Sequence, residues 1–306
     1  MILVAGEALV DLVLGGTEEV GAHLGGGPFN CARTLGRLEQ PVAYLGRISS
    51  DRFGERLRER LADDGVGLEA VVATDDPTTL ALAEVDEAGA ATYRFYVEGT
   101  SAPGLTVEDA LGVLPAEVEM LHAGTLGLVF EPTAAAIEAV AERVARSALV
   151  MIDLNCRPAA IDDPEGYRAR LRRLLPLCHV VKASDADLEW LDAGRSDVEA
   201  ARALLERGPT VVLLTRGDRG AAVVAARAET DVAAPRVEVA DTIGAGDAFG
   251  GGFLAWWRRE GLSAADLGRA DRVVEATRFA CLVAARTCER PGASPPRLAE
   301  LEDLPG

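Results

Sequence analysis

An aspartate flanked by small residues stands near the C-terminal end of this chain, in the stretch DTIGAGDAFGGGF (residues 241–253). Gly244, Ala245 and Gly246 have little or no side chain, so a ligand can approach their backbone N–H groups closely. If a helix begins near Asp247, those N–H groups and the helix dipole form an anion site. A carboxylate there indicates phosphoryl transfer, because it can take the proton of a hydroxyl that attacks a phosphoryl group.

One other interpretation of this stretch stays open at the level of sequence, and two other phosphate-binding motifs are discounted. A glycine-rich turn in which Asp247 caps the helix needs no ligand at all. The glycine spacing also comes near a dinucleotide fingerprint, but it lies far from the N-terminal strand and no ribose-binding acid follows. A Walker A motif, GxxxxGK[ST], is absent from the sequence, which excludes P-loop chemistry.

A second glycine-rich segment, GGGPFNCARTLGRL (residues 25–38), precedes a predicted helix. Its Asn30 can both donate and accept hydrogen bonds, which suits a polyol. Asp11, in GEALVDLV, is an acid on an apolar strand, and it either faces solvent or binds a ligand. We therefore expect a hydroxylated ligand between Asp11 and Asn30.

Composition narrows the class of partner. The 306 residues are 49% hydrophobic, and 31 basic against 49 acidic residues give a net charge of -18. Such a chain repels nucleic acid and anionic membrane, so we expect a small-molecule partner, and an anionic substrate needs a local positive cradle. The five cysteines are scattered without a CxxC pair, and the N-terminus lacks the basic region of a signal peptide. No apolar stretch is long enough to span a bilayer. These features predict a soluble, cytoplasmic protein.

The elements that must position these residues follow from hydrophobic periodicity. Apolar strands alternate with amphipathic helices, such as the helix beginning at Thr133 with Ile137, Val140 and Val144 on one face. This alternation predicts βαβ units and a parallel sheet covered on both faces. The period-two pattern over residues 80–97 predicts a β-hairpin, which could form a lid with residues 9–20 or an edge of the main sheet.

Ligands of open α/β sheets bind outside the carboxyl ends of the strands. Polar and glycine residues follow five predicted strands in this chain, so we expect them to meet in one cleft. They are Gly46, Arg47, Gly124, Thr125, Asn155, Arg157, Lys182, Ser184, Thr215 and Gly217.

Taken together, these motifs resemble the ribokinase/PfkB-type carbohydrate kinases over essentially the whole chain. DTIGAGDAFGGGF is similar to the C-terminal motif of that family, and GGGPFNCARTLGRL with GRISSDRFG is similar to its N-terminal motif. GEALVDL, DLNCRP and CERPGASPP look most like the bacterial fructokinase branch, with the 2-keto-3-deoxygluconate kinases close by.

The resemblance implies a three-layer, doubly wound, mostly parallel α/β fold. It implies one kinase domain over residues 1–306, with a β lid from about 9–20 and 80–100. The implied activity transfers the γ-phosphate of ATP, with Mg²⁺ and K⁺ as candidate ions, to fructose or a related ketose. The alternatives are 2-keto-3-deoxygluconate, ribose or a nucleoside as substrate, and a non-catalytic sugar or nucleotide sensor. A homodimer through the lid is a further expectation, while oligomeric state cannot be read from sequence.

The resemblance also assigns residues. Asp247 is the expected base, with Gly244, Ala245 and Gly246 as the anion hole. The expected sugar ligands are Asp11, Gly26, Gly27, Asn30, Thr125 and Arg157. The expected nucleotide site comprises Lys182, Ser184, Asp187, Thr215, Gly217 and Gly220. Asp241 and the Ile243 carbonyl are expected at a monovalent-cation site that is closed by residues 290–294.

Two positions depart from the pattern of the family. Ser184 and Asp187 replace its usual Asn-x-x-Glu, so we expect contact with magnesium through water. Ala280 and Cys281 stand where the family often places an asparagine beside the nucleotide, which leaves base selectivity open.

Overall fold

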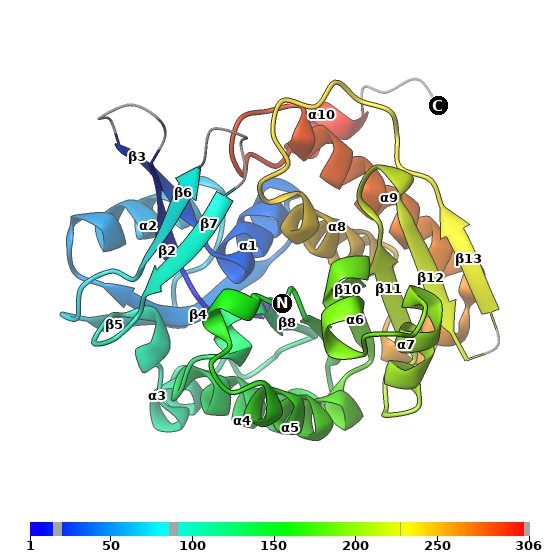
Figure 1. Ribbon diagram of the computed structural model, residues 1–306, viewed down its shortest axis with the longest axis horizontal. Helices are drawn as coiled ribbons and strands as arrows, with labels where there is room; N and C mark the ends of the chain where they lie inside the picture. The colour runs from blue at the N-terminus through cyan, green and yellow to red at the C-terminus, as the bar shows by residue number, and fades with distance from the viewer. Residues whose placement is uncertain (15–19, 86–90, 227, 303–306) are drawn as a thin grey trace.

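The larger of two β-sheets organises the molecule (Figure 1). The computed structural model describes residues 1–14, 20–85, 91–226 and 228–302. Within them this sheet has nine strands, in the order β13-β12-β11-β10-β9-β8-β1-β4-β5. The pairs from β5 to β11 are parallel, and β12 and β13 join antiparallel at one edge. The strands are β1 (Ile2–Ala5), β4 (Val42–Ser49), β5 (Val71–Thr74), β8 (Met120–Gly124), β9 (Leu149–Asp153), β10 (Val180–Ser184), β11 (Val211–Thr215), β12 (Ala221–Ala225) and β13 (Ala228–Val232). The mostly parallel sheet predicted from sequence is confirmed.

A smaller, separate sheet has the order β3-β2-β6-β7. Its strands are β2 (Leu9–Leu14), β3 (Val20–Gly25), β6 (Leu80–Val85) and β7 (Ala91–Tyr96). The predicted hairpin is confirmed in the antiparallel pairing of β6 with β7, whereas its turn, residues 86–90, lies outside the described residues. The lid was expected to end at about residue 20 in this part of the chain. Strand β3 instead continues the smaller sheet to Gly25, at the start of the glycine-rich segment.

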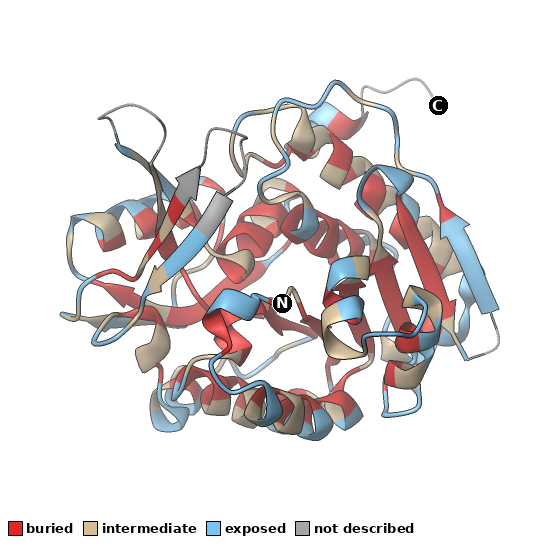
Figure 2. Ribbon diagram, in the orientation of Figure 1, coloured by how far each residue is buried: buried red, intermediate tan, exposed pale blue. Residues whose placement is uncertain are grey.

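Helices cover both faces of the larger sheet and complete the three layers. Alternate residues of each strand point to opposite faces, so Ile2 and Val4 enter one core while Leu3 and Ala5 enter the other. The strands from β12 to β4 are buried along most of their length, whereas the edge strand β13 is mostly exposed (Figure 2). On the first face lie α1 (Gly27–Arg37), α2 (Arg52–Asp63), α8 (Ala245–Arg259), α9 (Ala270–Cys288) and α10 (Ala299–Glu302). On the second lie α3 (Val107–Gly112), α4 (Thr133–Val144), α5 (Pro164–Leu174), α6 (Asp185–Leu191) and α7 (Asp197–Leu205).

Local sequence explains where several of these helices begin. Asp51 accepts the Gly54 N–H at the start of α2, and Ser184 with Asp187 forms a capping box at the start of α6. The predicted apolar face of α4 is buried through Ile137, Val140 and Val144. No helix among the described residues has the length and apolar character needed to cross a membrane.

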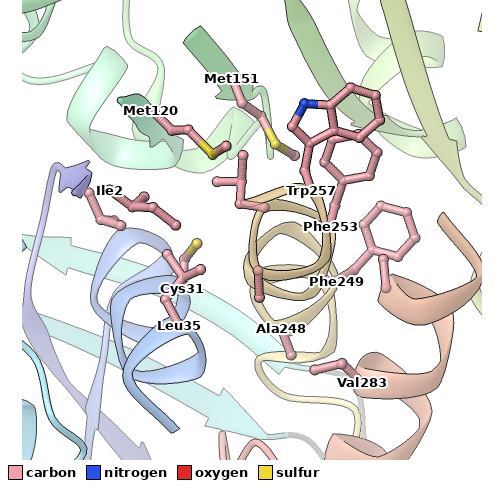
Figure 3. Packing of buried hydrophobic residues seen from close by; sticks show 14 of the residues in the cluster. Ile2, Cys31, Leu35, Met120, Met151, Ala248, Phe249, Phe253, Trp257 and Val283 are labelled. Carbon is pink, nitrogen blue, oxygen red and sulfur yellow. The ribbon is translucent and has the colours of Figure 1, made fainter. Parts of the chain in front are cut away.

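Helix α8 packs between α1 and α9, and its side chains Phe249, Phe253 and Trp257 enter the first core (Figure 3). Three consecutive glycines, 250–252, allow its neighbours to approach closely. A Cβ atom added at Gly251 would lie 2.8 Å from the Thr34 side chain, and one at Gly252 would lie 3.1 Å from the Cα of Ala280. These glycines therefore fix how close α8 lies to α1 and α9.

Candidate active site

Helix α8 begins at Ala245, and its first turn presents backbone donors to a cleft. Gly244 caps the helix with φ 77°, a left-handed conformation that glycine adopts without strain. A Cβ atom there would lie 2.6 Å from the Cβ of Ala293. The described residues supply no backbone acceptor to the N–H groups of Gly246 and Asp247, as expected for the first turn of a helix. These two N–H groups can therefore receive an anion.

Asp247 lies in this first turn and is 9% exposed. Its side chain does not cap α8, so the N-cap interpretation is wrong for this residue. Its Oδ2 instead accepts a hydrogen bond from Asn30 Nδ2 at 2.9 Å. Burial raises the pKa of Asp247 to about 6, while the Asn30 hydrogen bond opposes that rise. The carboxylate is thus largely ionised at neutral pH but holds its proton more tightly than an exposed aspartate.

The structure gathers the expected sugar ligands and Asp247 in one cleft of about 780 Å³. Its lining residues come from strand β2, from β3 and the turn after it, from α1, and from the loops after β8 and β9. Its predicted members are Asp11, Gly26, Gly27, Asn30, Thr125, Arg157, Asp241, Ile243, Gly244, Gly246 and Asp247, whereas Ala245 does not line it.

Asp11 points toward the glycine-rich turn. A Cβ atom at Gly25 would lie 2.2 Å from Asp11 Oδ2, so only glycine leaves room for this carboxylate. Burial raises the pKa of Asp11 to about 6, and the nearby His23 and Arg157 side chains oppose that rise. A carboxylate held in this way can accept hydrogen bonds from the hydroxyls of a sugar.

Sequence reasoning assigned no site role to Glu7, which lines the cleft. Glu7 is 2% exposed, and its carboxylate accepts the N–H groups of Gly27 at 3.0 Å and Gly127 at 2.8 Å. Burial raises the pKa of Glu7 to about 8. Its signal in the sequence was an acid that interrupts the apolar N-terminal run, as Asp11 also does.

Asn155, expected in the cleft from its place after a strand, lines it, and its Nδ2 donates to Thr125 Oγ1 at 3.2 Å. Both residues have positive φ, 35° for Asn155 and 55° for Thr125. Non-glycine residues rarely adopt this conformation, and such residues cluster at ligand sites. Asn155 was expected at a strand end, but its pairing with Thr125 depends on the packing of β8 beside β9.

The expected nucleotide residues do not line this cleft. Lys182 is 4% exposed and pairs with Asp153 at 2.7 Å. A Cβ atom at Gly246 would lie 3.3 Å from Lys182 Nζ, so the ammonium lies directly beneath the first turn of α8. Lys182 therefore places positive charge behind the anion site.

The remaining nucleotide candidates lie at the ends of β10 and β11, where Ser184 is opposite Thr215 in the register of the sheet. Asp187 accepts the N–H groups of Cys156 and Ser184, both at 2.7 Å, so each of its oxygens already has a partner. Gly217 and Gly220 have positive φ in the turn before β12. Ala280 and Cys281 are buried in the core beside α8.

Asp241 lies where the loop after β13 meets the loop after α9. Its Oδ1 accepts the Ile243 N–H at 3.0 Å, and its Oδ2 accepts the Gly292 N–H at 2.8 Å. The described residues contain no cluster of three or more histidine, cysteine, aspartate or glutamate side chains that could hold a metal ion. An ion at Asp241 would therefore rely on backbone carbonyls.

Comparison with known proteins agrees with this geometry. The chain matches the pfkB family of carbohydrate kinases over residues 1–300 and belongs to that family. A fructokinase of Rhizobium leguminosarum bv. trifolii is 37% identical over 267 residues, 86% of this chain and 81% of that protein. Two solved structures are also similar. A fructokinase of Xylella fastidiosa with bound ATP has a TM-score of 0.89 at 28% identity, covering 98% of this chain and 96% of that one. A fructokinase of Vibrio cholerae O395 with fructose, ADP and calcium has a TM-score of 0.83 at 25% identity, covering 95% and 94%. The protein is thus a carbohydrate kinase with the ribokinase-like fold.

Proposed function

We propose that this kinase transfers the γ-phosphate of ATP to a terminal hydroxyl of fructose, with Asp247 as the general base. The observation that carries the proposal is the place of Asp247, buried in the cleft beside unpaired N–H groups of its own helix turn. A hydroxyl that donates to Asp247 loses its proton as the bond to phosphorus forms. The N–H groups of Gly246 and Asp247, with Lys182 behind them, then stabilise charge on the phosphoryl oxygens.

We propose fructose and ATP as substrates because similar proteins are named fructokinases, and two of them were solved with ATP or with fructose and ADP. Asp11, Asn30 and Thr125 would bind the sugar hydroxyls. The residues that would flank the nucleotide are Lys182, Ser184, Asp187, Thr215, Gly217 and Gly220. We propose that Mg²⁺ binds together with the phosphates of ATP, as is usual for kinases, and that it contacts Asp187 through water. Asp241 and the Ile243 carbonyl are the proposed ligands of K⁺.

A sugar acid is the second candidate substrate, because Arg56 and Arg60 of α2 also line the cleft. Among the described residues no acid forms an ion pair with either guanidinium, although the chain carries an excess of acids. Such cations could bind the carboxylate of 2-keto-3-deoxygluconate.

Three further predictions belong to this proposal. Residues 1–306 form one kinase domain whose lid is the smaller sheet. A second copy binds through that lid, where Val20 is 52%, Tyr93 42% and Tyr96 51% exposed. Light scattering on the purified protein decides between monomer and dimer. The cysteines, all unpaired, favour a cytoplasmic location.

The deciding experiment is ADP release with MgATP and fructose, 2-keto-3-deoxygluconate, ribose or adenosine, with and without potassium. Saturable turnover on fructose that disappears in Asp247→Asn supports the proposal. Turnover on the sugar acid alone would replace fructose with the second candidate. Sugar binding without turnover on any of the four would favour a non-catalytic sensor.

A further inference from the structure

Arg33 is a buried cation next to the active site that the proposed chemistry does not use. It is 3% exposed and lies one turn after Asn30 on α1. Its Nε donates to Asp64 Oδ2 at 2.8 Å, and its Nη1 donates to the carbonyl oxygen of Ala293 at 2.8 Å. Burial lowers the pKa of Arg33, and the charge of Asp64 opposes that effect. A cation with so little exposure needs partners such as these.

The carbonyl that Arg33 binds belongs to the loop over the start of α8. In this loop, residues 291–294, Gly292 donates to Asp241 at 2.8 Å and Ala293 packs against the Gly244 turn. The loop therefore contacts both the candidate cation ligand and the residue that caps the anion site. Arg33 connects it to Asp64, which directly follows the end of α2.

Asn30 and Arg33 lie on the same face of α1, because they are three residues apart. Asn30 binds the carboxylate of Asp247, and Arg33 binds the loop that packs against Gly244. Helix α1 thus contacts the first turn of α8 directly through Asn30, and it contacts the loop against that turn through Arg33.

From these contacts we infer that Arg33 is a positioning residue for phosphoryl transfer, which locks residues 291–294 against the anion site through the Ala293 carbonyl. This role rests on the proposed function for its kinetic consequence, but the locking itself can be measured without turnover.

Arg37 provides a matched control. Its Nη1 also donates to Asp64, at 3.1 Å, but the Ala293 contact belongs to Arg33. Since Arg37 remains paired with Asp64 in Arg33→Met, that substitution does not leave the carboxylate alone. Arg37→Met removes the same kind of ion pair and keeps the loop contact.

The test is hydrogen–deuterium exchange of a peptide covering residues 289–296 in the full chain, followed by kinetics. Arg33→Met should raise its exchange rate by about tenfold, because the amides of Gly292 and Ser294 depend on an ordered loop. Its kcat should fall by about 10- to 100-fold with little change in the sugar KM. Arg37→Met should leave both exchange and kcat near wild type.

Unchanged exchange in a folded Arg33→Met protein, or equal changes in both variants, would overturn the inference. If Arg33→Met does not fold, Arg33→Gln replaces it, since its amide keeps a polar group in the buried site but ends short of the Ala293 carbonyl. Exchange near wild type in Arg33→Gln would then count against the role of Arg33. Because exchange is read without substrate, a failure of the fructose assay leaves this result intact.

Discussion

The side-chain amide of Asn30 donates to Oδ2 of Asp247 at 2.9 Å, so a candidate sugar ligand directly contacts the candidate base. The other end of that amide, Asn30 Oδ1, is buried and has no partner among the described residues. A sugar hydroxyl that donates to Oδ1 would complete its hydrogen bonding. The pair therefore links recognition of the acceptor to the ionisation of Asp247.

Replacing Asp247 by Asn should remove the base and leave the shape of the site. We expect kcat to fall by about 10²- to 10⁴-fold, while fructose binding measured by calorimetry changes little. Turnover close to wild type would show that another group takes the proton.

Activity should depend on pH through the ionisation of Asp247. Its pKa is raised to about 6, so kcat/KM should rise as pH increases through 6 and level off above 7 to 8. Asn30→Ala should shift this rise to higher pH, because the amide stabilises the ionised carboxylate. Asn155→Ala serves as the control, since its amide bonds Thr125 instead. A profile that is flat from pH 5 to 7 would argue against Asp247 as the base.

Glu7 should make the folded state less stable as pH rises. Its pKa is raised to about 8, so the folded protein keeps a proton that the unfolded chain releases near pH 4 to 5. Its contribution to the free energy of unfolding is fully present at low pH and is lost as pH rises toward 8. Asp11 and Asp247 act in the same direction.

The test for Glu7 is Tm against pH from 5 to 8.5. Glu7→Gln should flatten the decline, and Glu59→Gln on the surface of α2 should not. Equal slopes in wild type and Glu7→Gln would contradict the assignment.

Lys182 should matter for stability as well as for charge. Lys182→Met leaves Asp153 buried without its partner, which should cost about 3–5 kcal/mol in urea unfolding. The double variant Lys182→Met/Asp153→Leu should recover much of that loss. Arg219→Met breaks an exposed pair with Asp185 and should cost less than about 1 kcal/mol. If both single variants behaved alike, the pair would not be buried in solution.

Much of the sugar side of the site could be predicted from sequence, because parallel strands bring their carboxyl ends to one edge. That rule predicts that Thr125 and Arg157 lie together. The lack of side chains at Gly244 and Gly27 predicts that a ligand can approach the backbone there, and all four residues line the cleft. The location of Lys182 could not be predicted in the same way. Its partner follows from the register of β10 on β9, where Lys182 is opposite Asp153, and hydrophobic patterns do not specify register on a fully buried sheet.

Strand β3 was missed for a related reason. VGAHLG has two glycines and weak alternation, so only its pairing with β2 makes it a strand. The long-range contact from Arg33 to Ala293 joins segments 260 residues apart and leaves no local pattern.

The consecutive glycines of α8 make the middle of that helix a sensitive point for catalysis. Gly251 lies four residues after Asp247, about 6 Å along the helix axis, and it does not line the cleft. A Cβ atom there would lie 2.8 Å from the Thr34 side chain, so α8 and α1 could not keep their present separation unless Thr34 shifted. Substitution of Gly251 is thus constrained during evolution, because an added methyl group would alter the position of Asp247 from a site outside the sugar cleft.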